Sequence, residues 1–253
     1  MKKLLGLMLM AGITAMPLVA HAADTENGAD MQKLDQRLEN AADVLAQIQG
    51  AKDKSIPDWI AAKAKCIAVV PGLVKGAFIV GAEYGQGVVS CRTPHGWSGP
   101  VFIRMAGGSF GFQIGGSGTD LILVATNHKG MQDLLQTKFK LGGTAAVAAG
   151  PVGREAQAAT NLSMQAELLT YSRSHGVFAG VDLSGVTVSD NTDDTVALYG
   201  GQYHTFDQIL YGHVPPPRNH AALHYMHVLR QYFGEAAAQA QHHDESNNQS
   251  NEH

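Results

Sequence analysis

Several features that support catalysis or nucleic-acid binding are scarce or missing in this sequence. The chain has 253 residues, of which two are cysteines and 16% are charged, and its formal net charge is −4. Nucleic-acid binding needs a basic footprint, which this composition lacks. No glycine cluster leads into the Gly-Lys-Ser or Gly-Lys-Thr of a phosphate loop, and Gly85-Gln86-Gly87 lacks the rest of a dinucleotide fingerprint. Two cysteines cannot build a zinc cage. We therefore expect no cofactor and no nucleic-acid partner.

Long apolar runs are missing too, except at the N-terminus. Residues 1–22 begin with Met1-Lys2-Lys3, continue as an apolar run and end in Ala20-His21-Ala22, which is the order of a secretory signal peptide. We expect cleavage after Ala22 and export to the periplasm or beyond, as a membrane-associated or secreted protein. The alternative is an uncleaved anchor, for which the run is short and interrupted by Pro17. Without Lys2 and Lys3, 16 basic residues face 22 acidic ones, so any attraction to anionic lipid must come from a local patch.

Periodicity divides the remaining chain into helical ends and a strand-rich middle. Residues 23–55 are predicted to contain an amphipathic helix, because apolar residues recur every three or four positions from Met31 to Ile48 before Gly50. Residues 56–212 alternate short apolar runs with turns. Residues 213–234 hold a stiff proline linker and a second amphipathic helix, and residues 235–253 form a polar tail predicted to be disordered. This order favours an α+β fold, with an antiparallel, open or barrel-like β-sheet flanked by N- and C-terminal helices.

Glycines and prolines suggest where the strands of the middle segment turn. Pro71-Gly72 is predicted to end a strand that begins at Cys66, and Gly85-Gln86-Gly87 to form the turn of a hairpin. Cys66 and Cys91 each lie in a strand-like run, so neighbouring strands would bring them within bonding distance. In an oxidising compartment they are predicted to form a disulfide, and the alternative is a pair of buried free thiols.

Two glycine-containing stretches are the most distinctive part of the chain. One reads Gly150-Pro151-Val152-Gly153-Arg154, and the other runs from Tyr171 to Val181 as YSRSHGVFAGV. Together with Pro71, the Gly107–Gly115 run and the Trp97-Ser98-Gly99-Pro100 turn, they resemble the SYLF domain over about residues 56–210. The resemblance implies a non-enzymatic domain that binds phosphoinositide membranes and, in yeast SH3 proteins, actin. For an exported protein we expect an anionic envelope phospholipid or membrane surface as the partner. An envelope protein-interaction or assembly module is the alternative, and actin is not expected in that compartment.

The resemblance attributes lipid binding largely to an N-terminal amphipathic region, whose counterpart here is residues 30–65. Bases and an aromatic at the edge of an apolar stripe suit an interfacial helix. The predicted lipid contacts in this region are Lys52, Lys54, Trp59, Lys63 and Lys65. The alternative is that these helices simply cover the sheet.

Charged and amide side chains also lie among the predicted strands. Because an unpaired buried charge is costly, they are expected to pair in a polar network within the sheet. The set is Glu83, Arg104, Gln113, Arg154, Glu167 and Arg173. Arg154 follows a glycine-proline turn and Arg173 ends a strand, so both are candidate contacts for a lipid phosphate.

Two further patterns suggest chemistry, each with a structural alternative. Residues 107–111 fit the G-x-S-x-G of a serine hydrolase with Ser109 as nucleophile, but the following residues alternate like a strand, whereas that motif needs a helix there. A glycine-kinked strand is therefore favoured. His220, His224 and His227 share one face of the C-terminal helix, and the first two have metal-ligand spacing. The alternative is the solvent-facing side of a packed helix.

Overall fold

The computed structural model describes residues 20–51, 55–78, 80–110, 115–143, 145–152, 166–174, 177–179, 183 and 185–234. The helices are α1 (Ala20–Gln49), α2 (Asp58–Lys63), α3 (His128–Leu135), α5 (Thr192–Leu198), α6 (Phe206–Leu210) and α7 (His220–Leu229), which continues as the π-helical turn η2 (Arg230–Gly234). The strands are β1 (Cys66–Phe78), β2 (Val80–Thr93), β3 (Gly96–Trp97), β4 (Val101–Phe110), β5 (Gly115–Ala125), β6 (Lys138–Lys140), β7 (Val147–Ala149), β8 (Leu168–Ser174), β9 (Val177–Ala179) and β10 (Thr187–Asp190).

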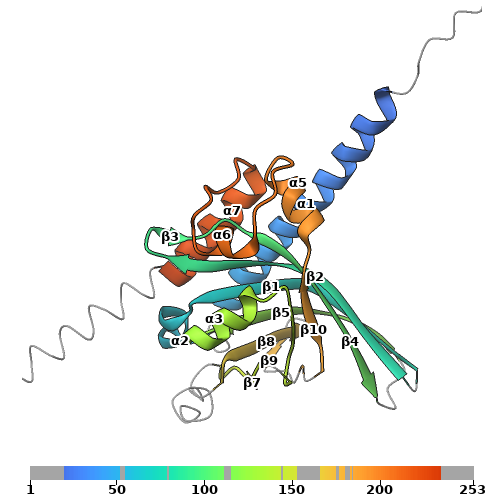
Figure 1. Ribbon diagram of the computed structural model, residues 1–253. Helices are drawn as coiled ribbons and strands as arrows, with labels where there is room; N and C mark the ends of the chain where they lie inside the picture. The colour runs from blue at the N-terminus through green and yellow to red at the C-terminus, as the bar shows by residue number, and fades with distance from the viewer. Residues whose placement is uncertain are drawn as a thin grey trace, which may run out of the picture.

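The strands form one curled ten-stranded sheet that resembles half a barrel (Figure 1). Their order is β6-β10-β4-β2-β1-β5-β8-β7, with β3 paired to β2 and β9 to β8. Every pair is antiparallel except β7 with β8, which is parallel. The predicted α+β class, with a mainly antiparallel sheet between helical ends, is confirmed.

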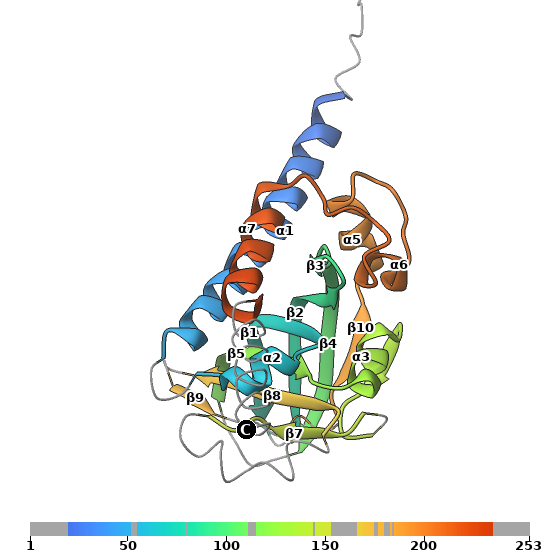
Figure 2. The same cartoon turned by 90° about the vertical axis from the view of Figure 1, so that its left-hand side faces the viewer.

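Helices α1 and α7 lie side by side across one face of the sheet (Figures 1 and 2). The predicted stripe of α1 is buried there, with Leu38, Leu45 and Ile48 fully covered, and Tyr225 and Leu229 of α7 are fully covered too. Each such side chain contributes roughly 1.5–3 kcal/mol of burial free energy. The stripe predicted from periodicity is therefore the part of α1 that covers the sheet. The N-terminal part of α1 projects away from the body of the protein, and no helix in the described segments is long and apolar enough to span a membrane.

A second core lies on the opposite face of the sheet, where α3 and α6 pack. Along β5, Ile122 and Val124 belong to the first core, whereas Leu121 and Leu123 belong to the second. This central strand is therefore buried on both faces, as its continuous apolar run predicts. Asn127 caps α3, because its side-chain oxygen accepts a 2.8 Å hydrogen bond from the Gly130 N–H.

The two turns predicted from Pro71-Gly72 and Gly85-Gln86-Gly87 are wrong. Strand β1 continues through Pro71-Gly72 as a bulge, where the register with β2 and β5 shifts and Gly72 adopts a φ of 59°. Strand β2 likewise continues through Gly85. A larger residue would not fit there, because its Cβ would lie 2.7 Å from Leu73 Cδ1 of the bulge. Gly72 supplies the left-handed backbone of the bulge, and Gly85 permits a close approach between strands, so neither reverses the chain.

Cys66 and Cys91 are directly opposite one another in the β1–β2 ladder and are joined by a disulfide. Both are fully buried in the second core. Of the two arrangements open to the sequence, the structure has the bridge.

Candidate functional site

The basic segment around α2 is only partly available for a lipid contact. Lys52 and Lys54 lie outside the described residues. Lys63 and Lys65 are exposed, and Lys63 Nζ lies 5.7 Å from the centre of the Trp59 ring. Trp59 itself packs partly buried against the first core, and Ile60 is fully buried. The apolar side of α2 therefore covers the sheet, and a lipid contact here would rest on the lysine charges.

Arg92 is the residue that anchors this region, and the sequence reasoning missed it. Its side chain donates to the carbonyl oxygens of Ala64 (3.0 Å) and Phe233 (2.8 Å), and its guanidinium lies 4.8 Å from the centre of the Trp97 ring. It thus joins the end of α2 to η2 at their carbonyl ends, which attract cations. Burial lowers the pKa of Arg92. The sequence signal that could have identified Arg92 is its position directly after Cys91, a residue expected to be buried.

Arg154 is outside the described residues, and Arg173 lies away from the α2 lysines. The guanidinium of Arg173 is 3.9 Å from the carboxylate of Asp120, whose other oxygen accepts a 3.0 Å hydrogen bond from Gly72 N–H. Cys66, next to α2, pairs with Ala125, five residues along β5 from Asp120. That spacing is about 17 Å along a strand. Arg173 and the lysines of α2 therefore do not form one site.

Paired polar groups cross the sheet at the edge of α1 as a charge belt. Its members are Arg37, Gln86, Arg104, Asp120, Arg173, Asn191 and Asp194. Arg37 reaches Asp194 at 2.6 Å and stacks 5.0 Å from the centre of the Phe102 ring, while also donating to Gln86. Arg104 donates to Asn191. Pairing offsets part of the cost of removing these groups from water.

The predicted polar network is only partly right, because its members separate into different places. Arg104 and Arg173 belong to the belt. Glu83 has the opposite parity to Gln86 along β2, so it faces the other side of the sheet. The carboxylate of Glu167 accepts hydrogen bonds from Lys129 Nζ and from the Ala146 N–H. Burial opposes ionisation of Glu167, but these hydrogen bonds outweigh it and lower its pKa. Gln113 is outside the described residues.

Beyond the charge belt, the same face of the sheet extends past α1, whose Lys33 and Gln36 line a shallow groove with Val74 and Tyr84 at the border. We call this surface the open end of the sheet. Its described exposed residues are Val74, Ala82, Tyr84, Ala106, Gly108 and Gly118. Val74 and Tyr84 are directly paired and 56% and 51% exposed. On the neighbouring strands, Gly118 of β5 pairs with Val74, and Ala106 of β4 pairs with Tyr84. The face is flat because most of its residues are small.

The open end carries no charge and finishes in large apolar residues. No charged residue occurs between Lys75 and Glu83, or between Arg104 and Asp120. At the far end, Val80 pairs with Phe78 on one side and Phe110 on the other. These strands extend past the helices in Figure 1, at the lower right. The surface therefore runs from paired charges, through Tyr84, to strand ends without charged residues.

The two chemical patterns of the sequence gain no support. Ser109 lies inside the continuous strand β4, opposite Gly81, instead of on a turn between a strand and a helix. The hydrolase alternative is therefore not supported. On α7, His224 Nδ1 lies 2.5 Å from Glu39 of α1, and His220 Nδ1 lies 3.9 Å from the same carboxylate. Within the described ranges, no group of three or more histidine, cysteine, aspartate or glutamate side chains is arranged to hold a metal ion.

Comparison with known proteins decides the family. Residues 106–232 match the family described as "Ysc84: Las17-binding protein actin regulator". This chain belongs to the Ysc84, or SYLF, family. It is 36% identical over 167 residues to "SH3 domain-containing YSC84-like protein 1" of Rattus norvegicus, which covers 65% of this chain and 48% of the relative. It is 32% identical over 196 residues to "LAS seventeen-binding protein 3" of Saccharomyces cerevisiae, which covers 74% of this chain and 42% of the relative. The chain thus spans about half the length of these relatives, or less.

The two SYLF signatures meet in the structure. Gly150 N–H donates a 2.8 Å hydrogen bond to the Thr170 carbonyl, which places the first signature beside β8. A Cβ on Gly150 would lie 2.6 Å from Cε1 of Tyr171, the first residue of the second signature. Tyr171 is fully buried, and burial raises its pKa. Gly150 and Tyr171 therefore serve packing in this SYLF chain, and neither forms a reactive centre.

Proposed function

We propose that this SYLF-family chain is a non-enzymatic protein that binds anionic phospholipid membranes in the cell envelope after export. The observation that carries the proposal is the uncharged open end of the sheet, with its exposed Val74–Tyr84 pair. An exposed apolar patch on a soluble domain usually marks an interaction surface.

The order of residues along the open end favours a lipid interface over a second protein. Charged pairs come first, then Tyr84, and then the small exposed residues Ala82 and Gly108. A bilayer changes in the same order, from charged headgroups through an interfacial layer that suits tyrosine to hydrocarbon. A protein partner would not require polarity to fall along the strand axis.

The dimensions and the hydrogen bonds also fit a shallow contact. From Ala82 to Val80 the strand advances about 7 Å, within the roughly 5–10 Å that interfacial elements enter. The backbones of β1 and β2 are paired on both sides here, so little polar backbone would lose water. The pairing of β4 with β10 ends at Ala106, and that of β5 with β8 ends at Asp120. Beyond these residues the outer edges of β4 and β5 are unpaired in the described ladders, which limits how deeply the open end can enter a bilayer.

Flotation with liposomes of phosphatidylcholine, with and without phosphatidylglycerol, tests the proposal. We expect the full chain to float with the anionic vesicles. A Val74→Ser, Tyr84→Ser variant should partition about tenfold more weakly, because burying these two exposed side chains is worth more than 1.4 kcal/mol. Tyr203→Ser removes a tyrosine that is 67% exposed in a loop and is the matched control, expected to bind like the parent. No flotation with any vesicle would exclude membrane binding.

The α2 lysines make a separate prediction. Cys66 lies next to α2 and Val74 lies eight residues further along β1, so α2 and the exposed Val74–Tyr84 pair are about 27 Å apart. Lys63→Glu with Lys65→Glu should weaken binding at low salt if α2 supplies the electrostatic contact, and the loss should shrink as salt screens the charges. Binding that is unchanged at low salt would assign the contact to the open end alone.

A protein partner is the second candidate function, and the names of the relatives favour it. The family is described as a Las17-binding actin regulator, and the yeast relative is named for binding LAS seventeen. Cosedimentation with filamentous actin tests the nearest version of this function. Pelleting with actin together with failure to float would favour the protein partner over lipid.

A further inference from the structure

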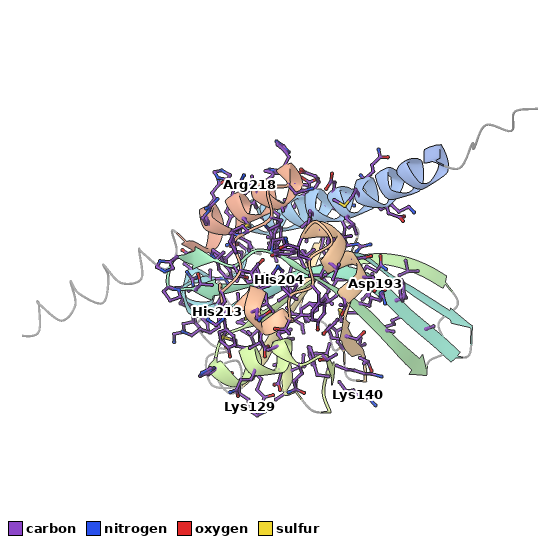
Figure 3. All side chains as sticks on the ribbon, turned by 45° about the horizontal axis from the view of Figure 1, so that its top comes forward. Lys129, Lys140, Asp193, His204, His213 and Arg218 are labelled. Atoms are coloured by element: carbon purple, nitrogen blue, oxygen red, sulfur yellow. A yellow bond between two sulfur atoms is a disulfide. The ribbon has the colours of Figure 1, made fainter. Side chains whose placement is uncertain are left out.

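A cavity lies between α1, α5 and the segment 213–219 that leads into α7. Its volume is about 760 Å³. Figure 3 labels three of the residues that line it, His204, His213 and Arg218. Sites for small molecules commonly measure about 300–1,000 Å³. The cavity is therefore large enough for a ligand of that class.

Apolar side chains from distant parts of the sequence build its walls. Met31 comes from α1, Leu198 from the end of α5, and Val214 and Pro216 from the proline segment. Leu198 is buried and packs into the first core, so this wall is fixed by the fold. Val214-Pro215-Pro216-Pro217 is stiff, because each proline ring locks its backbone φ. A wall of this kind is preformed rather than assembled around the ligand.

The polar residues of the cavity include bases and no acids. None of its lining residues is an aspartate or glutamate, although the whole chain has 22 acidic residues against 18 basic ones. Arg218 is exposed at the cavity and supplies a permanent positive charge. The His204 ring lies edge-on to the Tyr199 ring, with 5.9 Å between the ring centres, and the His213 ring stacks on the Tyr211 ring, with 6.2 Å between the ring centres. Charge and shape therefore select an anion that also carries an apolar part.

We propose that this cavity binds a single-chain anionic amphiphile, such as a fatty-acid carboxylate. The hydrocarbon chain lies against Met31, Leu198 and the prolines, and the carboxylate pairs with Arg218. A bidentate pair of guanidinium with carboxylate is the strongest contact that these side chains offer. This site is distinct from the open end of the sheet and does not depend on membrane binding.

Calorimetric titration of the full chain with decanoate below its micelle concentration tests the site without any vesicle. Decanol, with the same chain and no charge, should bind at least about tenfold more weakly, and acetate should not bind. Comparing octanoate with decanoate, the Kd should fall by up to about fourfold per added methylene. Equal affinity for octanoate and decanoate would overturn the proposal, because a chain-binding wall would then have no effect.

Substitution of the arginine separates a specific site from general adsorption. Arg218→Gln should weaken decanoate about tenfold and leave decanol unchanged. Arg230→Gln removes another exposed arginine, on η2, that does not line the cavity, and should bind decanoate like the parent. Equal losses in both variants would indicate a general charge effect and reject the site. The calorimetric titration contains no vesicles, so it is independent of the flotation experiment. If the full chain binds decanoate but does not float with any vesicle, the membrane proposal is rejected and the cavity proposal stands.

Discussion

Removing the disulfide between Cys66 and Cys91 should lower stability by an amount that the structure allows to be worked out. The two cysteines are 25 residues apart and already opposite each other in the β1–β2 ladder. The bond therefore acts mainly by restricting the unfolded chain. For a loop of this length the chain-entropy relation predicts a loss of about 3.5 kcal/mol at 25 °C. In a chain of this size that corresponds to a fall in Tm of roughly 7–14 °C.

Urea denaturation of the oxidised and reduced chain measures this loss, because the two forms differ only by the bond and two protons. A Cys66→Ala, Cys91→Ala variant serves as the control, since reducing agent should leave its unfolding midpoint unchanged. The reasoning would be refuted if reduction cost less than about 1 kcal/mol. The unfolded chain would then already be restricted, for example by residual β1–β2 pairing. A loss near the expected value would also mean that the protein depends on an oxidising compartment for full stability, in accord with the expected export.

Three other substitutions test the packing and the charges of the fold. Gly150→Ala should lower the free energy of unfolding by about 1–3 kcal/mol in chemical denaturation, because the new Cβ overlaps the buried ring of Tyr171. Gly143→Ala is the control and should have little effect, because its Cβ would make only ordinary contacts, the nearest at 3.5 Å. Arg92→Met should cost about 2–3 kcal/mol, since the charged hydrogen bonds at two helix ends are lost; an unchanged Tm would contradict the anchoring role. Burial raises the pKa of Asp190 to about 6, so the folded carboxyl keeps its proton where the unfolded one loses it, and stability falls as pH rises from about 4 to 6. Asp190→Asn should therefore raise stability at pH 8 by about 1 kcal/mol, after allowance for its partial exposure, and change little at pH 4.

Local patterns predicted those elements whose residues depend mainly on their neighbours in sequence. The stripe of α1, the Asn127 cap and the doubly buried β5 were all predictable, because helix and strand periodicity and capping act over a few residues. The turns at Pro71-Gly72 and Gly85 were mispredicted for the opposite reason. The bulge at Gly72 and the close approach at Gly85 both depend on how β1 pairs with its neighbouring strands, which cannot be read from one segment.

The candidate sites show the same division. The lysines of α2 were identifiable as a basic cluster, but only the structure shows that Trp59 and Ile60 are used in packing. The open end of the sheet was not identified, because its face combines residues from four strands whose register is set by the whole sheet. The cavity near Arg218 depends in the same way on Met31, nearly 190 residues earlier in the chain.

By itself, the amino-acid sequence determined the family, the α+β class, the buried stripes and the pair of cysteines able to bridge, since motif, periodicity and residue type are properties of the chain. Tertiary structure decided which apolar residues are covered, which charges are paired and where a surface is left open. Those outcomes depend on register and on helix placement, because a side chain on a strand is buried or exposed according to what packs on its face.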